Sequence, residues 1–183
     1  MSGERVPSPG QTIGPFYGFA LPYDGDHLLV PAGQAGAVRL HGRVLDGAGS
    51  PVPDALVEVW QPDPDGRVVQ AEGSLHRDAF TFTGWGRAAT DRTGHYWFST
   101  LTPGAMDGRA PFFSLTVFAR GLLDRLLTRA YLPDAAADSD PFLASVDPMR
   151  RSTLLAVRDD TGYRFDIRLQ GDGETVFLAH PRH

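Results

Sequence analysis

Short segments in which apolar and polar residues alternate recur along this chain, and turn residues separate them. In one such segment the apolar positions are Val38, Leu40, Gly42 and Val44, and in another they are Tyr163, Phe165, Ile167 and Leu169. A period of two places successive side chains on opposite faces of a β-strand. Short, half-buried strands between turns predict an all-β sandwich and argue against a helical bundle.

The composition supports many turns. The 183 residues include 21 glycines and 15 prolines, about a fifth of the chain against an average near 12%, and the length fits one domain. Further strands are predicted at 55–61, 95–100 and 112–119, the last in the centre of a sheet, and a hairpin at 153–158 and 162–169. We expect an interruption at 84–87 and a short helix at 142–146, whereas 122–132 fits either a helix or a strand.

The first 37 residues differ from the rest. They carry five prolines between residues 7 and 31 and four aromatic side chains between residues 16 and 23. Proline prevents regular pairing and keeps the backbone extended. We therefore predict an N-terminal arm over 1–37 and a β-sandwich domain over 38–183. Composition leaves open whether the arm packs on its own domain or on a partner subunit.

Charge and cysteine content exclude several classes of function. The net charge of −5 gives no basic surface for nucleic acid or for an anionic membrane. The absence of cysteine removes disulfides, thiolate metal sites and thiol nucleophiles. The start of the chain does not have a signal-peptide pattern, and no apolar run approaches 18 residues, so we expect a soluble, cytoplasmic protein.

Spacing alone predicts no autonomous active site. The six histidines form no compact metal-binding motif, and we expect His41, on the polar side of its strand, to be solvated. No nucleophile elbow or phosphate-binding loop is present. The aspartates fall mainly in predicted turns, where this residue is favoured for local hydrogen bonds; they are Asp63, Asp65, Asp91, Asp159 and Asp160.

Several blocks of residues, in order along nearly the whole chain, are similar to one known family. They include 42–61 (GRVLDGAGSPVPDALVEVWQ), 82–87 (FTGWGR), 94–100 (GHYWFST), 128–131 (TRAY) and 169–177 (LQGDGETVF). The sequence resembles the intradiol ring-cleavage dioxygenases. The resemblance implies the transthyretin-like β-sandwich of that family, with an extended N-terminal arm and few short helices.

Within the family, the chain resembles the α chains of members that are built from homologous α and β chains. In those members the β chain holds Fe(III) with two tyrosines, two histidines and a hydroxide. It inserts both atoms of O₂ into protocatechuate, which gives 3-carboxy-cis,cis-muconate. The resemblance thus implies a β partner in an (αβ)n assembly and iron in that partner. The number of αβ units stays open.

The positions that match the iron ligands of the family carry other residues in this chain. They are Val68 for one tyrosine, Ala105 or Met106 for the other, and Phe112 and Ser114 for the two histidines. Phenolate and imidazole are good donors for Fe³⁺, whereas these side chains are not. The resemblance therefore predicts that this chain binds no metal and has no catalytic residue of its own.

The resemblance also implies that the arm over 1–37 packs on the β chain and has a supporting role at the substrate pocket of that chain. The residues expected to line that pocket are Thr12, Gly14, Pro15, Phe16 and Arg129. A guanidinium near the pocket would attract an aromatic acid. Arg129 could equally form a structural ion pair. Position 16 is usually tyrosine in the family, so its hydroxyl is missing here unless Tyr17 replaces it.

Two other functions stay open at this stage. One is a self-sufficient intradiol dioxygenase with relocated ligands, for example Tyr96, Tyr131 and His95. The other is a transthyretin-like binding module without ring-cleavage activity. The arm motif at 12–16 argues against the second, because a generic module has no use for it.

Overall fold

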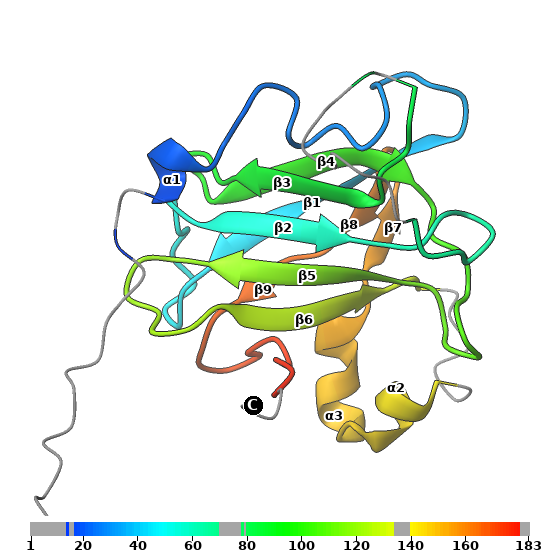
Figure 1. Ribbon diagram of the computed structural model, residues 1–183. Coiled ribbons are helices and arrows are strands. Elements are labelled where there is room, and N and C mark those ends of the chain that lie inside the picture. Colours follow the sequence, from blue (N-terminus) through cyan, green and yellow to red (C-terminus); the bar gives the residue numbers. More distant parts are fainter. Residues whose placement is uncertain (1–13, 15–16, 70–77, 79, 134–139, 180–183) are drawn as a thin grey trace, which may run out of the picture.

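The computed structural model describes residue 14 and residues 17–69, 78, 80–133 and 140–179. Two β-sheets face each other, one with the strand order β4-β1-β8-β7 and with β9 paired to β1, the other with the order β3-β2-β5-β6 (Figure 1). The strands are β1 (Ala37–Leu45), β2 (Leu56–Trp60), β3 (Trp85–Ala89), β4 (His95–Leu101), β5 (Phe112–Phe118), β6 (Leu126–Tyr131), β7 (Val157–Asp159), β8 (Gly162–Arg164) and β9 (Ile167–Arg168).

The helices are short and peripheral. They are α1 (Tyr17–Ala20), α2 (Pro141–Ser145) and α3 (Pro148–Arg151), followed by a 3-10 turn over Ser152–Leu154. None of the helices in the described ranges has the length and apolar character needed to span a membrane. The prediction of an all-β sandwich with few short helices is confirmed.

The main core lies between the two sheets. The alternation in β1 buries Leu40 and Val44 and leaves Arg43 exposed, as predicted. From the other sheet, β5 contributes Phe113 and Leu115, both fully buried. β5 lies between β2 and β6, so its predicted central position is confirmed. Burial of this apolar surface is the main stabilising contribution to the fold.

The predicted interruption at 84–87 is wrong, because β3 already begins at Trp85. A methyl group at Gly86 would lie 2.5 Å from Leu29 Cδ1 and 3.1 Å from the carbonyl oxygen of Asp26. Glycine at this position therefore lets the N-terminal segment approach the strand closely instead of breaking it. The ambiguous segment 122–132 contains strand β6.

The predicted C-terminal hairpin is present but shorter than expected. Its first strand is only β7, and Ser152–Leu154 upstream form the 3-10 turn. Asp159 Oδ1 accepts hydrogen bonds from the backbone nitrogens of Thr161, at 2.8 Å, and Gly162, at 3.0 Å. These bonds close the turn between β7 and β8 and confirm the structural role predicted for this aspartate.

The prediction that His41 is solvated is wrong. Its Nε2 atom lies 2.7 Å from Asp159 Oδ2, and its side chain is only 17% exposed. β1 pairs with β8, and the turn before β8 brings Asp159 next to His41. A strand-level pattern could not show this, because the partner lies 118 residues away in the sequence.

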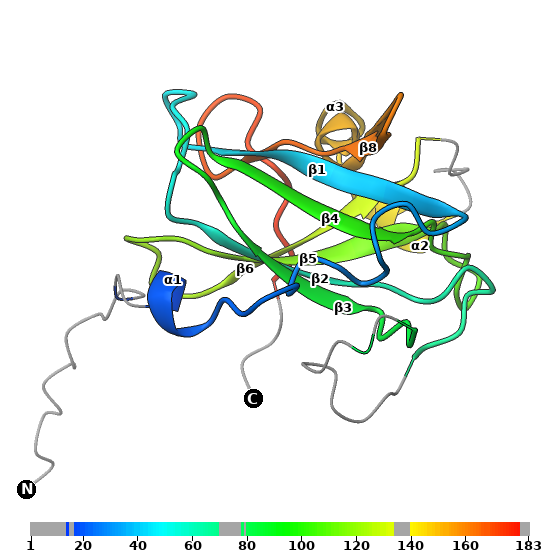
Figure 2. The same ribbon diagram turned by 90° about the horizontal axis from the view of Figure 1, so that it is seen from above.

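The described second half of the N-terminal arm packs on its own domain. It runs along β3 and β4 in both views (Figures 1 and 2). The carbonyl oxygen of Asp26 accepts a hydrogen bond from Arg87 N of β3, and the carbonyl oxygen of His27 accepts one from Ser99 N of β4, at 2.9 and 3.0 Å. Leu29, 3% exposed, joins the main core. The arm thus joins the edge strands of the two sheets.

A second apolar cluster lies between the helices and one end of the four-stranded sheet. Its buried members are Ala110, Phe112, Tyr131, Leu143 and Leu154. α2 and α3 lie together beside β6 (Figure 1). The predicted helix at 142–146 is confirmed as α2. The guanidinium of Arg129 lies over the rings of Phe112 and Phe142, which belong to this cluster or pack against it.

Candidate functional site

Arg129 stands on the outer face of the four-stranded sheet. In the pairing of β5 with β6, Ser114 is opposite Arg129 and Phe112 is opposite Tyr131. Their neighbours Phe113 and Ala130 point into the main core. Because side chains alternate along a strand, the four paired residues face the other side of the sheet, away from that core.

The guanidinium of Arg129 is held in one place by aromatic rings. Its Cζ atom lies 4.3 Å from the ring centre of Phe112 and 5.2 Å from that of Phe142. Its Nη1 atom donates a hydrogen bond of 3.0 Å to the Tyr131 hydroxyl. A cation over an aromatic face is stabilised electrostatically, more so where water is partly excluded. The half-buried Arg129 is thus a positioned cation, and no carboxylate of the described residues forms an ion pair with it.

Tyr131 connects this cation to a buried carboxylate. Its hydroxyl lies 3.3 Å from Asp140 Oδ1 and donates to it. Burial, only partly opposed by Arg129, raises the pKa of the Tyr131 phenol above its ordinary value. The hydroxyl therefore stays protonated at neutral pH. It can accept from Arg129 and donate to Asp140 at the same time.

Asp140 is fully buried and well satisfied by hydrogen bonds. Its Oδ1 atom accepts from the backbone nitrogens of Phe142 and Leu143, at 2.9 and 3.0 Å, which caps α2. Its Oδ2 atom accepts from Ala110 N at 3.1 Å. A buried carboxylate is tolerated when such donors replace its water. Asp140 thereby ties the β4–β5 loop, β6 and α2 together.

The structure brings the loops that match the family's iron-ligand positions close together. A methyl group at Gly66, two residues before Val68, would lie 1.9 Å from the carbonyl oxygen of Ala105. Met106 packs against the second cluster, which also contains Phe112. The matching positions therefore gather near the end of the sheet where Arg129 stands.

The donors at these positions do not fit a ferric ion. The side chains are Val68, Ala105, Met106, Phe112 and Ser114. Phe112 packs under Arg129 and Met106 packs in the apolar cluster. Fe³⁺ prefers phenolate, imidazole and carboxylate donors, and a thioether suits softer ions. These side chains are therefore unsuited to hold a ferric ion.

Of the four arm residues predicted to line the substrate pocket, the structure describes Gly14. Thr12, Pro15 and Phe16 lie outside the described residues. Gly14 is exposed, and a methyl group there would meet no atom within 4 Å. The structure does not bring Gly14 and Arg129 into contact.

Tyr17 does not supply the hydroxyl that Phe16 lacks. Its hydroxyl donates to the backbone carbonyl of Asp54. Burial and the charge of Asp54 raise the pKa of Tyr17 to about 12. The Tyr17 phenol is therefore neutral, and it is bound to its own domain.

The three residues of the alternative ligand set, Tyr96, Tyr131 and His95, do not lie together. Tyr96 points into the main core, where its hydroxyl donates to the carbonyl oxygen of Phe165 at 2.6 Å. His95, the preceding residue, points to the opposite face of the sheet and lies near His41. Tyr131 belongs to the second cluster. This arrangement does not support a self-sufficient iron site built from these three residues.

Sequence reasoning found Arg129 but not the residues that hold it. Asp140 precedes Pro141, and an aspartate before a proline is a typical start of a helix. That signal could have placed a buried cap there. The contact of Phe142 with Arg129 depends on how α2 packs against β6, and no local pattern indicates it.

Comparison with known proteins gives one consistent family. The sequence profile of a family described as "Dioxygenase" matches residues 12–112. The alpha chain of protocatechuate 3,4-dioxygenase from Burkholderia cepacia is 36% identical over 191 residues, which cover 93% of this chain and 96% of that one. The beta chain from the same organism is 38% identical over 160 residues, covering 73% of this chain and 64% of that one.

A solved structure supports the same fold. The dioxygenase domain of a dioxygenase–carbohydrate-binding protein fusion from Streptomyces sp. SirexAA-E superposes with a TM-score of 0.60 at 24% identity, covering 91% of this chain and 99% of that one. The similarity to the alpha chain extends over nearly the whole length of both proteins. The chain therefore belongs to the intradiol ring-cleavage dioxygenase family.

Proposed function

We propose that this chain is the non-catalytic α subunit of a protocatechuate 3,4-dioxygenase. It completes the substrate pocket of an iron-bearing β subunit, which cleaves protocatechuate with O₂ to 3-carboxy-cis,cis-muconate. The main support for this proposal is the difference between two sets of residues at one end of the four-stranded sheet. The positions of the iron ligands hold apolar side chains and Ser114, whereas Arg129 is firmly positioned beside them.

The partner in this proposal is a homologous β subunit in an (αβ)n assembly. Relatives of this chain include both an alpha and a beta chain of the same enzyme. The family implies iron, and the donor set of this chain does not suit it, so we assign Fe(III) to the β subunit. We further propose that the arm over 1–37 contacts that subunit through its first residues, because the arm from Tyr17 onward packs on its own domain. Thr12, Gly14, Pro15 and Phe16 would line its pocket.

Arg129 would act on the substrate through its charge. Protocatechuate carries a carboxylate, and a guanidinium attracts and orients such a group through its planar set of donors. The rings of Phe112 and Phe142 and the Tyr131 hydroxyl hold this cation in a fixed orientation. A cation that is already ordered loses less entropy when it binds its partner.

Metal content and colour test the division of labour between the subunits. Purified alone, the full chain is expected to be colourless and to contain no stoichiometric iron. Co-expressed with a β homologue, it should give a coloured, oxygen-consuming complex, since ferric tyrosinate absorbs visible light. Metal analysis and visible absorption spectra check both samples. Stoichiometric iron and colour in the lone chain would contradict the proposal.

Tyr131→Phe tests how Arg129 is positioned. The variant keeps the ring and removes the hydroxyl that receives the bond from Arg129 Nη1. In the complex we expect KM for protocatechuate to rise about two- to fivefold with little change in kcat, as for one neutral hydrogen bond. Steady-state kinetics measure this. Tyr163→Phe also removes a hydroxyl that accepts from an arginine, Arg158, on the other sheet. It is the control and should leave KM unchanged.

A further inference from the structure

A second positioned arginine, Arg39, lies on β1 of the five-stranded sheet, whereas Arg129 lies on β6 of the four-stranded sheet. Arg39 of β1 lies with its Cζ atom 4.6 Å from the ring centre of Trp97 on β4. Its Nε atom has almost no accessible surface and no hydrogen-bond partner among the described residues. Within the same ranges, no carboxylate forms an ion pair with Arg39. This cation is therefore partly desolvated without a compensating anion, which is an unfavourable state on its own.

A hollow of about 440 Å³ lies beside this cation. It is lined by Ala32, Gly33, Ala37, Val38, Arg39, Trp97, Ser99 and Thr161. Among the described residues that line the hollow, Arg39 alone carries a charge. Alanine, valine and the indole ring offer an apolar surface, while Ser99 and Thr161 carry hydroxyl groups. Such a mixture of apolar walls with few polar groups is typical of small-molecule sites.

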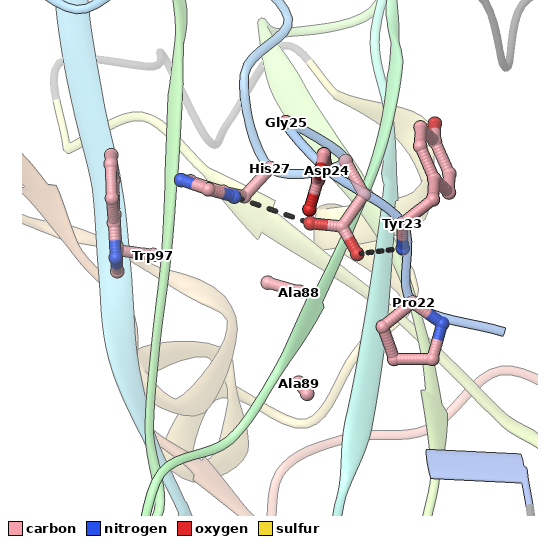
Figure 3. A pocket seen from close by; sticks show the side chains of 9 residues that line it. Pro22, Tyr23, Asp24, Gly25, His27, Ala88, Ala89 and Trp97 are labelled. Atoms are coloured by element: carbon pink, nitrogen blue, oxygen red, sulfur yellow. Dashed lines mark hydrogen bonds and ion pairs between the residues drawn. The ribbon is translucent and has the colours of Figure 1, made fainter. Parts of the chain in front are cut away.

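The other side of Trp97 has the opposite character. There a hollow of about 390 Å³ is lined by Asp24, Asp26 and His27 among others. Figure 3 shows His27 between Asp24 and the Trp97 ring. The Nδ1 atom of His27 lies 3.2 Å from Asp26 Oδ1. The His27 and Trp97 rings meet edge to face, with centres 4.3 Å apart. Trp97 thus separates an acidic hollow from the hollow of Arg39.

Asp159 lies across β8 from Arg39, because Gly162 pairs with both residues, and its carboxylate already has partners. Asp159 binds His41 Nε2 at 2.7 Å and accepts from the Thr161 hydroxyl at 2.8 Å. On the same face, the charges of Arg39 and Arg43 add to burial in lowering the pKa of His95. Arg39 therefore contributes positive charge to the hollow, and Arg43 contributes positive charge on the same face of β1.

We propose that the hollow beside Arg39 is a binding site for an organic carboxylate. The carboxylate group pairs with the Arg39 guanidinium, and the apolar body of the ligand lies against Trp97 and the alanines. Charge-assisted hydrogen bonds to a guanidinium are among the stronger polar contacts in proteins. The carboxylate comes either from a free small molecule or from an acidic side chain of the partner subunit, and the experiment below separates these sources.

Titration of sodium benzoate into the full chain, followed by calorimetry, tests the site. We expect saturable binding that Arg39→Gln weakens about tenfold or more. Arg43→Gln is the matched control: it removes the same charge from the same face of β1, at an exposed position outside the hollow, and should change the affinity less than twofold. Benzyl alcohol, which has the ring without the carboxylate, should bind at least tenfold more weakly. Arg39→Lys keeps the charge and should retain part of the affinity, which distinguishes loss of the site from loss of the fold.

The same titration with the complex of α and β chains shows whether the carboxylate comes from a free small molecule or from the partner subunit. If the complex also binds benzoate and Arg39→Gln assembles normally, the site takes a free carboxylate. If the complex no longer binds benzoate and Arg39→Gln weakens assembly, the partner supplies the carboxylate. Equal benzoate binding by the wild-type chain and Arg39→Gln, together with unchanged assembly, overturns the proposal and leaves the proposed function untouched.

Discussion

Replacing Arg129 with alanine in the complex of the two chains is expected to raise KM for protocatechuate about 10- to 100-fold, while kcat falls less than about threefold. The range corresponds to one charge-assisted hydrogen bond to the substrate carboxylate. Binding and orientation suffer because the cation is lost, whereas the iron and O₂ chemistry belongs to the partner. Steady-state kinetics at varied protocatechuate concentration give both constants.

Arg129→Lys and an uncharged substrate complete this test. Lysine keeps the charge but not the planar fork or its stacking on Phe112 and Phe142, so an intermediate KM is expected. Catechol lacks the carboxylate, so its turnover should respond little to either substitution. An unchanged KM in Arg129→Ala would show that this arginine only braces the second cluster.

Asp140→Ala is expected to lower the free energy of unfolding by at least about 3 kcal/mol. The substitution removes the cap of α2 and leaves the buried nitrogen of Ala110 and the hydroxyl of Tyr131 without their acceptor. Loss of a cap costs about 1 kcal/mol, and each buried donor left unsatisfied costs about 1–3 kcal/mol. Urea denaturation followed by circular dichroism measures the change.

Asp147 provides the matched control for Asp140. It caps α3 through one bond of 2.8 Å to Met149 N and is exposed. Asp147→Ala should therefore cost only about 1 kcal/mol. If both variants lost the same small amount of stability, the network of Asp140 would be no more than an ordinary helix cap.

Much of the sandwich could be predicted from local patterns. The strands with clear alternation or strong β propensity, β1, β2, β4 and β5, appear where expected. The errors fall where a distant segment decides the outcome. β3 continues through Gly86 because Leu29 packs there, and His41 is shielded because Asp159 reaches it across the sheet.

The candidate site could likewise be predicted only in part from the sequence. Family motifs located Arg129 and the positions without iron donors. They did not reveal the rings of Phe112 and Phe142 around the guanidinium, nor the buried carboxylate of Asp140 behind Tyr131. These contacts join three segments that are separate in the sequence, and only the packing of α2 against β6 brings them together.

The N-terminal segment that bridges β3 and β4 has a consequence for how the protein can be divided. A chain shortened to begin at residue 38 would lose Leu29 from the core and uncover the hydrogen-bonding groups of Arg87 and Ser99 on two edge strands. Uncovered strand edges are templates for self-association. The segment therefore belongs to the folding unit of the sandwich. It covers two strand edges that would otherwise favour aggregation, and it connects the sandwich to the residues that precede it.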